Sequence, residues 1–257
     1  MKGERRTARR AARRLGAVAL ALVGTSCSGA FGMPRGASEQ GRDIFHLWQV
    51  FIIAAIPVAG IVYGLIAWSV IRYRRRRSEE PGALGEQFRG NVPLEVVYIV
   101  IPVLIVIGLF VVSVVVQDRV DALSPHPDLT VDVQAYQWGW RFVYVDQGVT
   151  VVSPPSGEFV PGPELVLPLG ETARFVLTSN DVVHSFWVPG FLYKHDAIPG
   201  YTFRFDITPS EAGTFIGECA EFCGLNHAYM RFSVRVVAAA EFDAWVAAQR
   251  AATGAAS

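Results

Sequence analysis

Two long apolar runs lie in the N-terminal half of the chain. Residues 47–71 carry no charged side chain, and neither do residues 96–116. Each run reaches the roughly 20 apolar residues that a membrane-spanning helix needs. Pro57 and Gly60, inside the first run, are tolerated in such helices. The pattern therefore predicts two transmembrane helices, at about residues 47–71 and 96–117.

Five arginines follow the first apolar run, namely Arg72, Arg74, Arg75, Arg76 and Arg77. Basic residues beside a membrane span are retained on the cytoplasmic side. Residues 72–92 are therefore predicted to be a cytoplasmic connector within a transmembrane hairpin that covers residues 28–118. Both ends of this hairpin then lie outside the cytoplasm, so the C-terminal half is predicted to be exported, which suits cysteine and metal chemistry.

A different periodicity begins after a Pro-containing linker at residues 124–128. Val131, Val133 and Ala135 alternate with polar neighbours, which is typical of a half-buried strand that continues through residues 136–144. Further strands are predicted at residues 164–169, 172–179, 201–208, 213–219 and 230–237, with Pro- and Gly-containing turns between them. A short helix is predicted at residues 241–250. The C-terminal half thus reads as an all-β sandwich or barrel.

The first 27 residues have the pattern of an export signal. Arginines precede a short apolar run at residues 15–23, which is too short to span a bilayer. The residues Gly24-Thr25-Ser26-Cys27 are similar to a bacterial lipoprotein cleavage site, although Gly24 stands where Leu or Val is expected. Lipidation of Cys27, a simple signal cleaved near Ser26 and an uncleaved leader all stay open.

The charge distribution limits the class of partner. The formal net charge of the 257 residues is zero, but residues 1–117 hold 15 basic and 7 acidic side chains, and residues 118–257 hold 8 and 16. The predicted exported half is therefore acidic, which favours a basic partner. Nucleic acid is excluded as a partner because the basic residues lie in the leader and at the membrane flank.

Residues 218–230 gather the chemistry of the exported half. This window holds Cys219, Cys223, His227 and Met230, and beyond residue 33 the chain has no other Cys or Met. Thiolate, imidazole and thioether groups together select copper. A Cys219–Cys223 disulfide is the alternative, but it would close a loop too short to stabilise much. Zinc is the rival metal, and the thioether and the lack of a CxxC pair argue against it.

The copper hypothesis requires a distant histidine as well. His184 is the best candidate because it follows the predicted strand at residues 172–179, in a loop at one end of the sandwich. One Cys with two His and one Met describes a mononuclear blue-copper site. Two cysteines can bridge two metals, so a binuclear centre is chemically natural. His46, His126 and His195 are interpreted as structural residues.

The ligand segment, Cys219-Ala220-Glu221-Phe222-Cys223-Gly224-Leu225-Asn226-His227-Ala228-Tyr229-Met230, closely resembles the CuA loop of cytochrome c oxidase subunit II. Residues 181–185 and 194–200 look like that family's other signatures, and Gln137-Trp138-Gly139-Trp140 resembles its aromatic stretch. The resemblance runs from about residue 47 to residue 237, and the Arg-rich leader resembles bacterial, actinobacterial-like members. It implies a two-helix transmembrane hairpin followed by an all-β, cupredoxin-like Greek-key sandwich at residues 119–240, with a C-terminal helix and tail at 241–257.

The resemblance also implies a role for individual residues. Copper ligands would come from His184, Cys219, Glu221, Cys223, His227 and Met230, with the two thiolates bridging a binuclear copper centre (CuA) and Glu221 contributing its backbone carbonyl. The Glu221 side chain would reach a magnesium ion shared with subunit I. Trp138 would be the point where electrons enter, whereas Trp140 fits a core aromatic better. Glu95 would stand at the entrance of a proton pathway, although a carboxylate there also caps a helix.

The implied function is that of an oxidase subunit in a bacterial plasma membrane, with the copper domain on the extracytoplasmic side. Electrons from cytochrome c would pass through this chain to haem in subunit I, where oxygen is reduced to water and protons are pumped. The implied partners are subunit I and the other oxidase subunits, cytochrome c and the lipid bilayer. The alternatives are a membrane-anchored copper-delivery module and a quinol oxidase subunit II, which lacks the copper ligands. Nitrous oxide reductase carries a similar loop, but on a large soluble enzyme.

Overall fold

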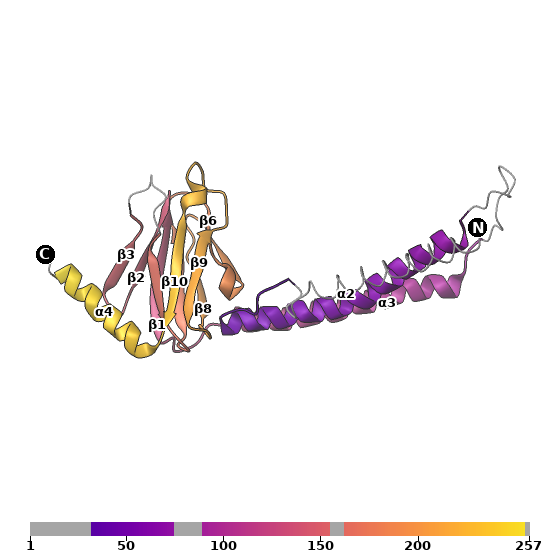
Figure 1. The fold of residues 1–257 in the computed structure, drawn as a ribbon, viewed down its shortest axis with the longest axis horizontal. Coiled ribbons are helices and arrows are strands. Elements are labelled where there is room, and N and C mark those ends of the chain that lie inside the picture. The colour runs from indigo at the N-terminus through magenta and orange to yellow at the C-terminus, as the bar shows by residue number, and fades with distance from the viewer. Residues whose placement is uncertain (1–31, 75–88, 155–161, 255–257) are drawn as a thin grey trace, which may run out of the picture. The chain divides into compact units, whose positions relative to one another are not determined.

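The computed structural model describes residues 32–74, 89–154 and 162–254. The chain divides into two units, residues 1–35 and residues 36–257, and every described helix and strand belongs to the second (Figure 1). The leader predicted at residues 1–27 lies outside the described residues, as does most of the predicted connector.

Two long helices occupy the predicted spans. They are α2 (Glu39–Arg72) and α3 (Val92–Val120), and both are long and apolar enough to cross a membrane. The helices contact each other, and the most apolar stretch of each has no buried residue, so their apolar side chains are available to lipid or to partner helices. Helices at both spans are thus confirmed. Each helix is longer than its apolar run because a capping residue, Ser38 or Asn91, sets its first turn.

Five strands form the first sheet of the C-terminal domain, in the order β3-β2-β1-β5-β8. They are β1 (Leu129–Tyr136), β2 (Gly139–Tyr144), β3 (Val149–Val152), β5 (Ala173–Ser179) and β8 (Phe203–Ile207). The pair β1 and β5 is parallel, and the other pairs are antiparallel. Every second residue of β1 is buried, so this sheet turns one face to the core, as the alternation predicted.

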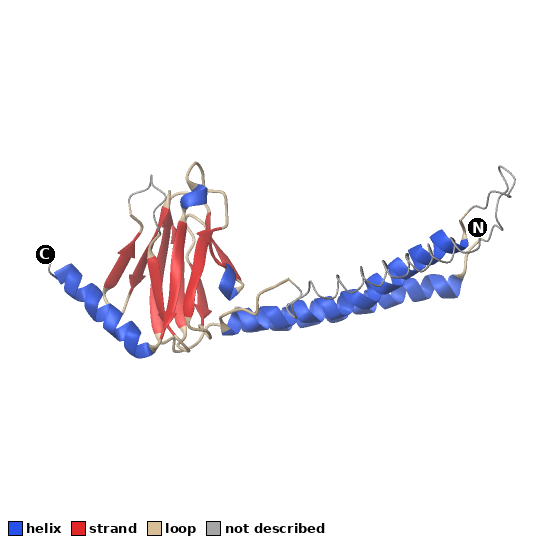
Figure 2. Cartoon of the chain, in the orientation of Figure 1, coloured by secondary structure: helices blue, strands red, loops and turns tan. Residues whose placement is uncertain are grey.

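Five further strands form the second sheet, in the order β4-β10-β9-β6-β7. They are β4 (Glu164–Pro168), β6 (His184–Val188), β7 (Tyr193–Ala197), β9 (Gly213–Cys219) and β10 (Arg231–Val237). Here β4 and β10 are the parallel pair. The two sheets form a β-sandwich (Figure 2), which confirms the predicted cupredoxin-like fold.

An aromatic cluster joins the two sheets in the core. Trp140 of the first sheet is fully buried and packs edge-to-face on Phe186 and Phe232 of the second, with ring centroids 5.8 and 5.3 Å apart. Phe186 in turn stacks on Phe232 at 4.9 Å. Trp140 is therefore a core residue, as expected, and its cluster supports β6, which begins at His184, and β10, which follows the predicted ligand segment.

The residues just before α2 are bound to the sandwich. Ser38 is fully buried, donates its hydroxyl to the carbonyl of Phe191 in the short 3-10 helix η1 (Pro189–Phe191), and accepts the N–H of Gly41. Backbone bonds extend this contact: Ala37 N–H to Gly190 O, Glu39 N–H to Thr208 O, and Ser210 N–H to Ala37 O. A Cβ at Gly41 would lie 2.3 Å from the Phe191 oxygen, so the close approach requires glycine.

An ion pair fixes the linker between α3 and β1. The carboxylate of Asp206 accepts two bonds of 2.8 Å from Arg174 and one of 2.6 Å from the backbone N–H of Ser124. Arg174 also donates to the carbonyl of Ser124 at 2.6 Å. The exit from α3 is therefore attached to β5 and β8 by side chains, and not only by chain connectivity.

The C-terminal helix α4 (Ala239–Gly254) closes one side of the sandwich. Phe242 and Val246 are buried, and Trp245 packs on Tyr144 with ring centroids 5.0 Å apart. The helix predicted at residues 241–250 is thus present. The helix is longer than predicted because its ends are polar or small and carry no periodic apolar signal.

The strands β3, β6 and β7 were not predicted, and the predicted position of His184 was wrong. His184 was expected in a loop, but it is the first residue of β6. Four of the five residues of β6 are buried, so the polar–apolar alternation that marks a half-buried strand is missing. The continuous strand predicted from Val131 through residue 144 is also wrong, because a turn at Gln137-Trp138 divides it into the antiparallel pair β1 and β2. The other predicted strands are present with small shifts; β8 begins at Phe203, and β10 begins one residue after Met230.

Candidate metal centre

The predicted ligand segment connects two adjacent strands of the second sheet. Cys219 is the last residue of β9, and Met230 directly precedes β10. The segment between them folds into a short loop that contains the 3-10 helix η2 (His227–Tyr229). The rigid β9–β10 pair therefore fixes both ends of the loop, which gives a metal site on it a defined geometry.

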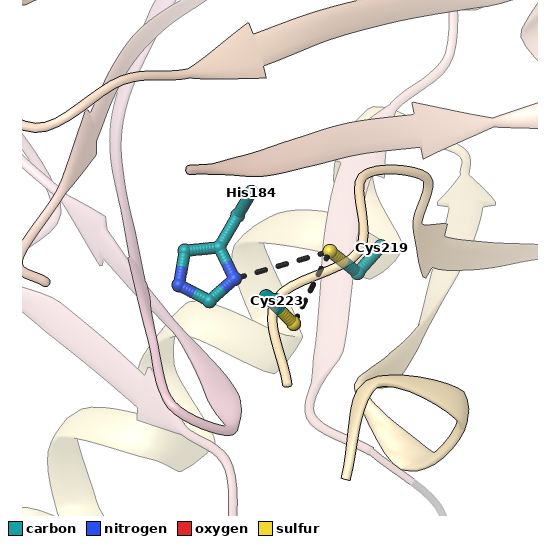
Figure 3. A group of neighbouring side chains, drawn as sticks. All are labelled: His184, Cys219 and Cys223. Carbon is teal, nitrogen blue, oxygen red and sulfur yellow. Dashed lines mark hydrogen bonds between the residues drawn. The ribbon is translucent and has the colours of Figure 1, made fainter. Parts of the chain in front are cut away.

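The two cysteines and His184 form one cluster (Figure 3). The sulfur of Cys219 lies 3.9 Å from the sulfur of Cys223 and 3.9 Å from Nδ1 of His184. The three ligand atoms all lie within 4.8 Å of one another, and all three residues are buried. Among the described residues, this is the group of His, Cys, Asp or Glu side chains that fits a metal ion.

The distance between the sulfurs rejects the disulfide alternative. A disulfide has its sulfurs about 2.05 Å apart, whereas these lie 3.9 Å apart and both thiols are free. With metal–sulfur bonds of about 2.3 Å, one ion can bind two sulfurs up to roughly 4.6 Å apart. The cysteine pair is therefore arranged to share a metal.

His227 and Met230 complete the set of soft atoms around Cys223. Nδ1 of His227 lies 3.6 Å from the Cys223 sulfur, and the thioether sulfur of Met230 lies 3.8 Å from it. Met230 is fully buried, so its thioether faces the cluster and not solvent. The donor set fits copper, because it combines thiolate, imidazole and thioether.

Strand register brings His184 to the loop. Phe186 of β6 pairs with Cys219 of β9, which places the start of β6 beside the end of β9. The N–H of Ala220 donates to the carbonyl of Ser185 at 3.0 Å and continues this contact. His184 thus reaches the cysteines through sheet pairing between segments far apart in the sequence.

Asp181 orients the imidazole of His184. One carboxylate oxygen lies 2.8 Å from Nε2 of His184, which leaves Nδ1 facing the cysteine sulfurs. Histidine ligands commonly bind a metal through one nitrogen while the other is held by a carboxylate. The three-residue spacing between Asp181 and His184 is visible in the sequence, but this role of Asp181 was not predicted from it.

The turn between β1 and β2 packs against the loop from the first sheet. The indole N–H of Trp138 and the side-chain amide of Gln137 both donate to the carbonyl of Cys223, at 3.1 and 2.8 Å. The backbone N–H of Gln137 donates to Asp181 at 2.7 Å. Gly224, with φ of +116°, allows this approach, since a Cβ there would lie 3.2 Å from both side chains. Sequence reasoning noted Gln137 only as part of an aromatic stretch.

Burial and hydrogen bonding give the two thiols different acidities in the metal-free chain. Burial raises the pKa of the Cys219 thiol, but bonds with His184 and the backbone outweigh it and lower the pKa to about 7. Burial and the neighbouring Cys219 sulfur raise the pKa of Cys223 to about 12. Burial alone would lower the pKa of His184, yet its bonds with Cys219 and Asp181 raise it. Thiolate character therefore begins at Cys219.

Of the other predicted site residues, Glu221 lies at this cluster and Glu95 lies away from it. The backbone carbonyl of Glu221 lies 3.2 Å from the Cys219 sulfur, and its side chain is exposed. Glu95 lies in the first turn of α3, where its carboxylate accepts the N–H of Asn91 at 3.2 Å, so the capping interpretation has a physical basis. His195 stacks on Phe205 with centroids 5.6 Å apart, which supports its structural interpretation.

Comparisons with known proteins identify relatives of both parts of the chain. The family model for the cytochrome c oxidase subunit II transmembrane domain matches residues 26–116, and the model for the periplasmic domain matches residues 160–237. A probable cytochrome c oxidase subunit 2 of Streptomyces avermitilis is 39% identical over 240 residues, covering 80% of this chain and 75% of the relative. Cytochrome c oxidase subunit 2 of Mycobacterium tuberculosis is 32% identical over 288 residues, covering 90% and 79%.

A solved structure matches as well. The crystal structure of the periplasmic domain of subunit II of cytochrome oxidase from Bradyrhizobium japonicum is 33% identical, with a TM-score of 0.45, and covers 50% of this chain and 97% of that one. The family models together match more than half of the sequence, and the curated relatives align with most of their own length. This chain belongs to the cytochrome c oxidase subunit II family.

Proposed function

We propose that this chain holds the binuclear copper centre, CuA, of a haem-copper cytochrome c oxidase. Copper bound there would supply one-electron transfer, so that electrons from cytochrome c would pass through this chain to haem in subunit I, where oxygen is reduced to water and proton pumping is coupled to it. The observation that carries the proposal is the pair of free, buried sulfurs 3.9 Å apart, surrounded by two imidazoles and a thioether.

Each ligand has a position that suits its proposed role. Cys219 and Cys223 would hold the copper pair together with His184, which lies beside Cys219, and His227, which lies beside Cys223. The thioether of Met230, beside the Cys223 sulfur, and the carbonyl of Glu221, beside the Cys219 sulfur, would complete the ligand set. The buried cluster excludes bulk water, and the β9–β10 pair would limit movement of the ligands at the two ends of the loop.

Trp138 is proposed as the point where electrons enter. Its ring is partly exposed, while its indole N–H bonds directly to the carbonyl of the ligand Cys223. A donor that contacts the exposed part of the ring would therefore be joined to the centre by one hydrogen bond. The acidic character of residues 118–257 would attract a basic cytochrome c to this domain.

Two acids extend the proposal to the partner subunit. The exposed carboxylate of Glu221 is available for a magnesium ion shared with subunit I. Glu95, at the start of α3, would stand at the cytoplasmic entrance of a proton pathway, because its capping bond to Asn91 leaves one oxygen for another partner. The two helices would anchor the chain in a bacterial plasma membrane, with the copper domain on the extracytoplasmic side.

Electron paramagnetic resonance on the full chain tests the copper proposal. The chain, purified in detergent and loaded with copper, should bind two coppers and give the signal of a mixed-valence pair. His184→Ala should abolish or transform this signal, whereas His126→Ala, in the exposed linker, should leave it unchanged. A four-line mononuclear spectrum with one copper per chain would contradict the proposal.

A further inference from the structure

The ligand loop is weakly supported at its apex. Phe222 and Leu225, on either side of Cys223 and Gly224, are 78% and 88% exposed, so packing does little to hold this part of the loop. Sheet pairing fixes the ends of the loop, through the bonds of Cys219 to Met230 and of Ala220 to Ser185. The position of Cys223 therefore depends on other contacts.

Those contacts come from the β1–β2 turn. Within the described part of the chain, the Glu221 carbonyl accepts a bond from the Cys219 thiol at the end of β9. The other hydrogen bonds that join backbone groups of residues 221–224 to elements outside the loop are the two accepted by the Cys223 carbonyl. Of these, the bond from the Gln137 amide, at 2.8 Å, is shorter than the bond from Trp138, at 3.1 Å. A carbonyl fixed in this way limits rotation of the Cys223 backbone, and with it the direction of the thiol.

Gln137 is also attached to the opposite side of the cluster. Its backbone N–H donates to Asp181, whose other oxygen holds Nε2 of His184. One residue of the first sheet thus contacts both ligand-bearing segments of the second sheet. A substitution at position 137 leaves the backbone bond to Asp181 in place, so it isolates the contribution of the side-chain amide to Cys223.

We propose that Gln137 is a positioning residue for the copper centre, which acts by holding the Cys223 carbonyl with its side-chain amide. The inference rests on the proposed function. Residues that hold a ligand from outside the metal shell typically change metal affinity by 10–100-fold when they are replaced. Because Trp138 still donates to the same carbonyl after Gln137 is replaced, the expected effect is at the lower end of this range.

The test compares three variants of the full chain in detergent. Gln137→Leu removes the amide donor, and Gln137→Lys returns an N–H donor on a stem of similar reach. Gln134→Leu is the matched control: it is the same substitution in the preceding strand, at a side chain on the face of β1 away from the core. The measurements are the copper hyperfine pattern, the rate of copper release to a chelator, and hydrogen exchange of residues 220–226 in the metal-free chain.

Gln137→Leu should change the hyperfine pattern, release copper about tenfold faster and speed exchange of the loop amides. Gln137→Lys should restore these values at least in part, and Gln134→Leu should match the wild type. If Gln137→Leu keeps the wild-type pattern, release rate and exchange, Gln137 does not position the centre. Equal effects from Gln134→Leu would likewise overturn the inference. A mononuclear signal from the wild type would instead refute the proposed function itself.

Discussion

Asp206→Asn should destabilise the C-terminal β-sandwich by removing the charge that holds the linker after α3. The carboxylate accepts three hydrogen bonds, two from Arg174 and one from the N–H of Ser124. Asparagine has nearly the same shape but offers one acceptor oxygen and no charge, so Arg174 loses its ionic partner. The Arg174 side chain is only 19% exposed, and water can compensate for the loss only in part.

The size of the effect follows from these contacts. Breaking a buried ion pair on one side costs about 3–5 kcal/mol, and hydrogen bonds to charged groups contribute about 1.5–3 kcal/mol each. Because asparagine keeps one acceptor, we expect a loss of about 3 kcal/mol in the free energy of unfolding. For a chain of this size, 1 kcal/mol lowers the melting temperature by about 2–4 °C, so the expected fall is about 6–12 °C.

Near-ultraviolet circular dichroism of the full chain in detergent measures this melting temperature. The matched control is Glu241→Gln, which makes the same acid-to-amide change beside Arg235 at a residue that is 58% exposed. This control should lower the melting temperature by less than about 2 °C, since exposed ion pairs contribute little to stability. If Asp206→Asn lowers the melting temperature no more than Glu241→Gln does, the Asp206–Arg174 ion pair does not stabilise the domain. The double variant Arg174→Met with Asp206→Leu should recover part of the loss, because no buried charge is then left unpaired.

Three further predictions concern the site and its support. Trp138→Ala should slow electron acceptance from reduced cytochrome c more than Gln137→Leu does, as measured by stopped flow. Both variants remove one hydrogen-bond donor to the Cys223 carbonyl, so equal slowing would refute a role for the Trp138 ring. Gly217→Ala should destabilise the sandwich by about 1–3 kcal/mol, because the new Cβ would lie 2.1 Å from the buried ring of Phe232. Calorimetry measures this loss, and an unchanged melting temperature would contradict the close packing of Gly217 on Phe232. In the metal-free chain, the pKa of about 7 makes Cys219 a thiolate above neutral pH, while Cys223, with a pKa of about 12, stays a thiol. Iodoacetamide at pH 8 should therefore modify Cys219 before Cys223, and this preference should weaken as the pH drops below 7. Equal labelling of the two cysteines in mass spectrometry would refute the difference in pKa.

The sequence carried enough information to predict the parts of the fold that depend on local pattern. The two apolar runs predicted α2 and α3, and the alternation at Val131, Val133 and Ala135 predicted β1. The grouping of the two cysteines with His227 and Met230 was also local, since all four lie in one loop. Each of these signals lies within one continuous stretch of the sequence.

What the sequence did not predict depends on pairing between distant segments. Residue type and the family resemblance pointed to His184, but its strand was missed because β6 is buried on both faces and meets β9 through the Phe186–Cys219 pair. The bonds of Gln137 to Cys223 and to Asp181 cross from one sheet to the other, over 86 and 44 residues of sequence. No periodicity or short motif records such contacts.

The attachment of residues 37–41 to the sandwich has a consequence for the biogenesis of this protein. Their partners are in η1, in Thr208 and in Ser210, so the receiving surface exists only after β8 has been synthesised and folded. Residues 37–41 therefore leave the ribosome long before the surface that binds them has formed. A shortened version that starts after the membrane helices would leave the acceptors at Gly190, Phe191 and Thr208 to water, and a tag placed close to Ala37 would compete for the same surface.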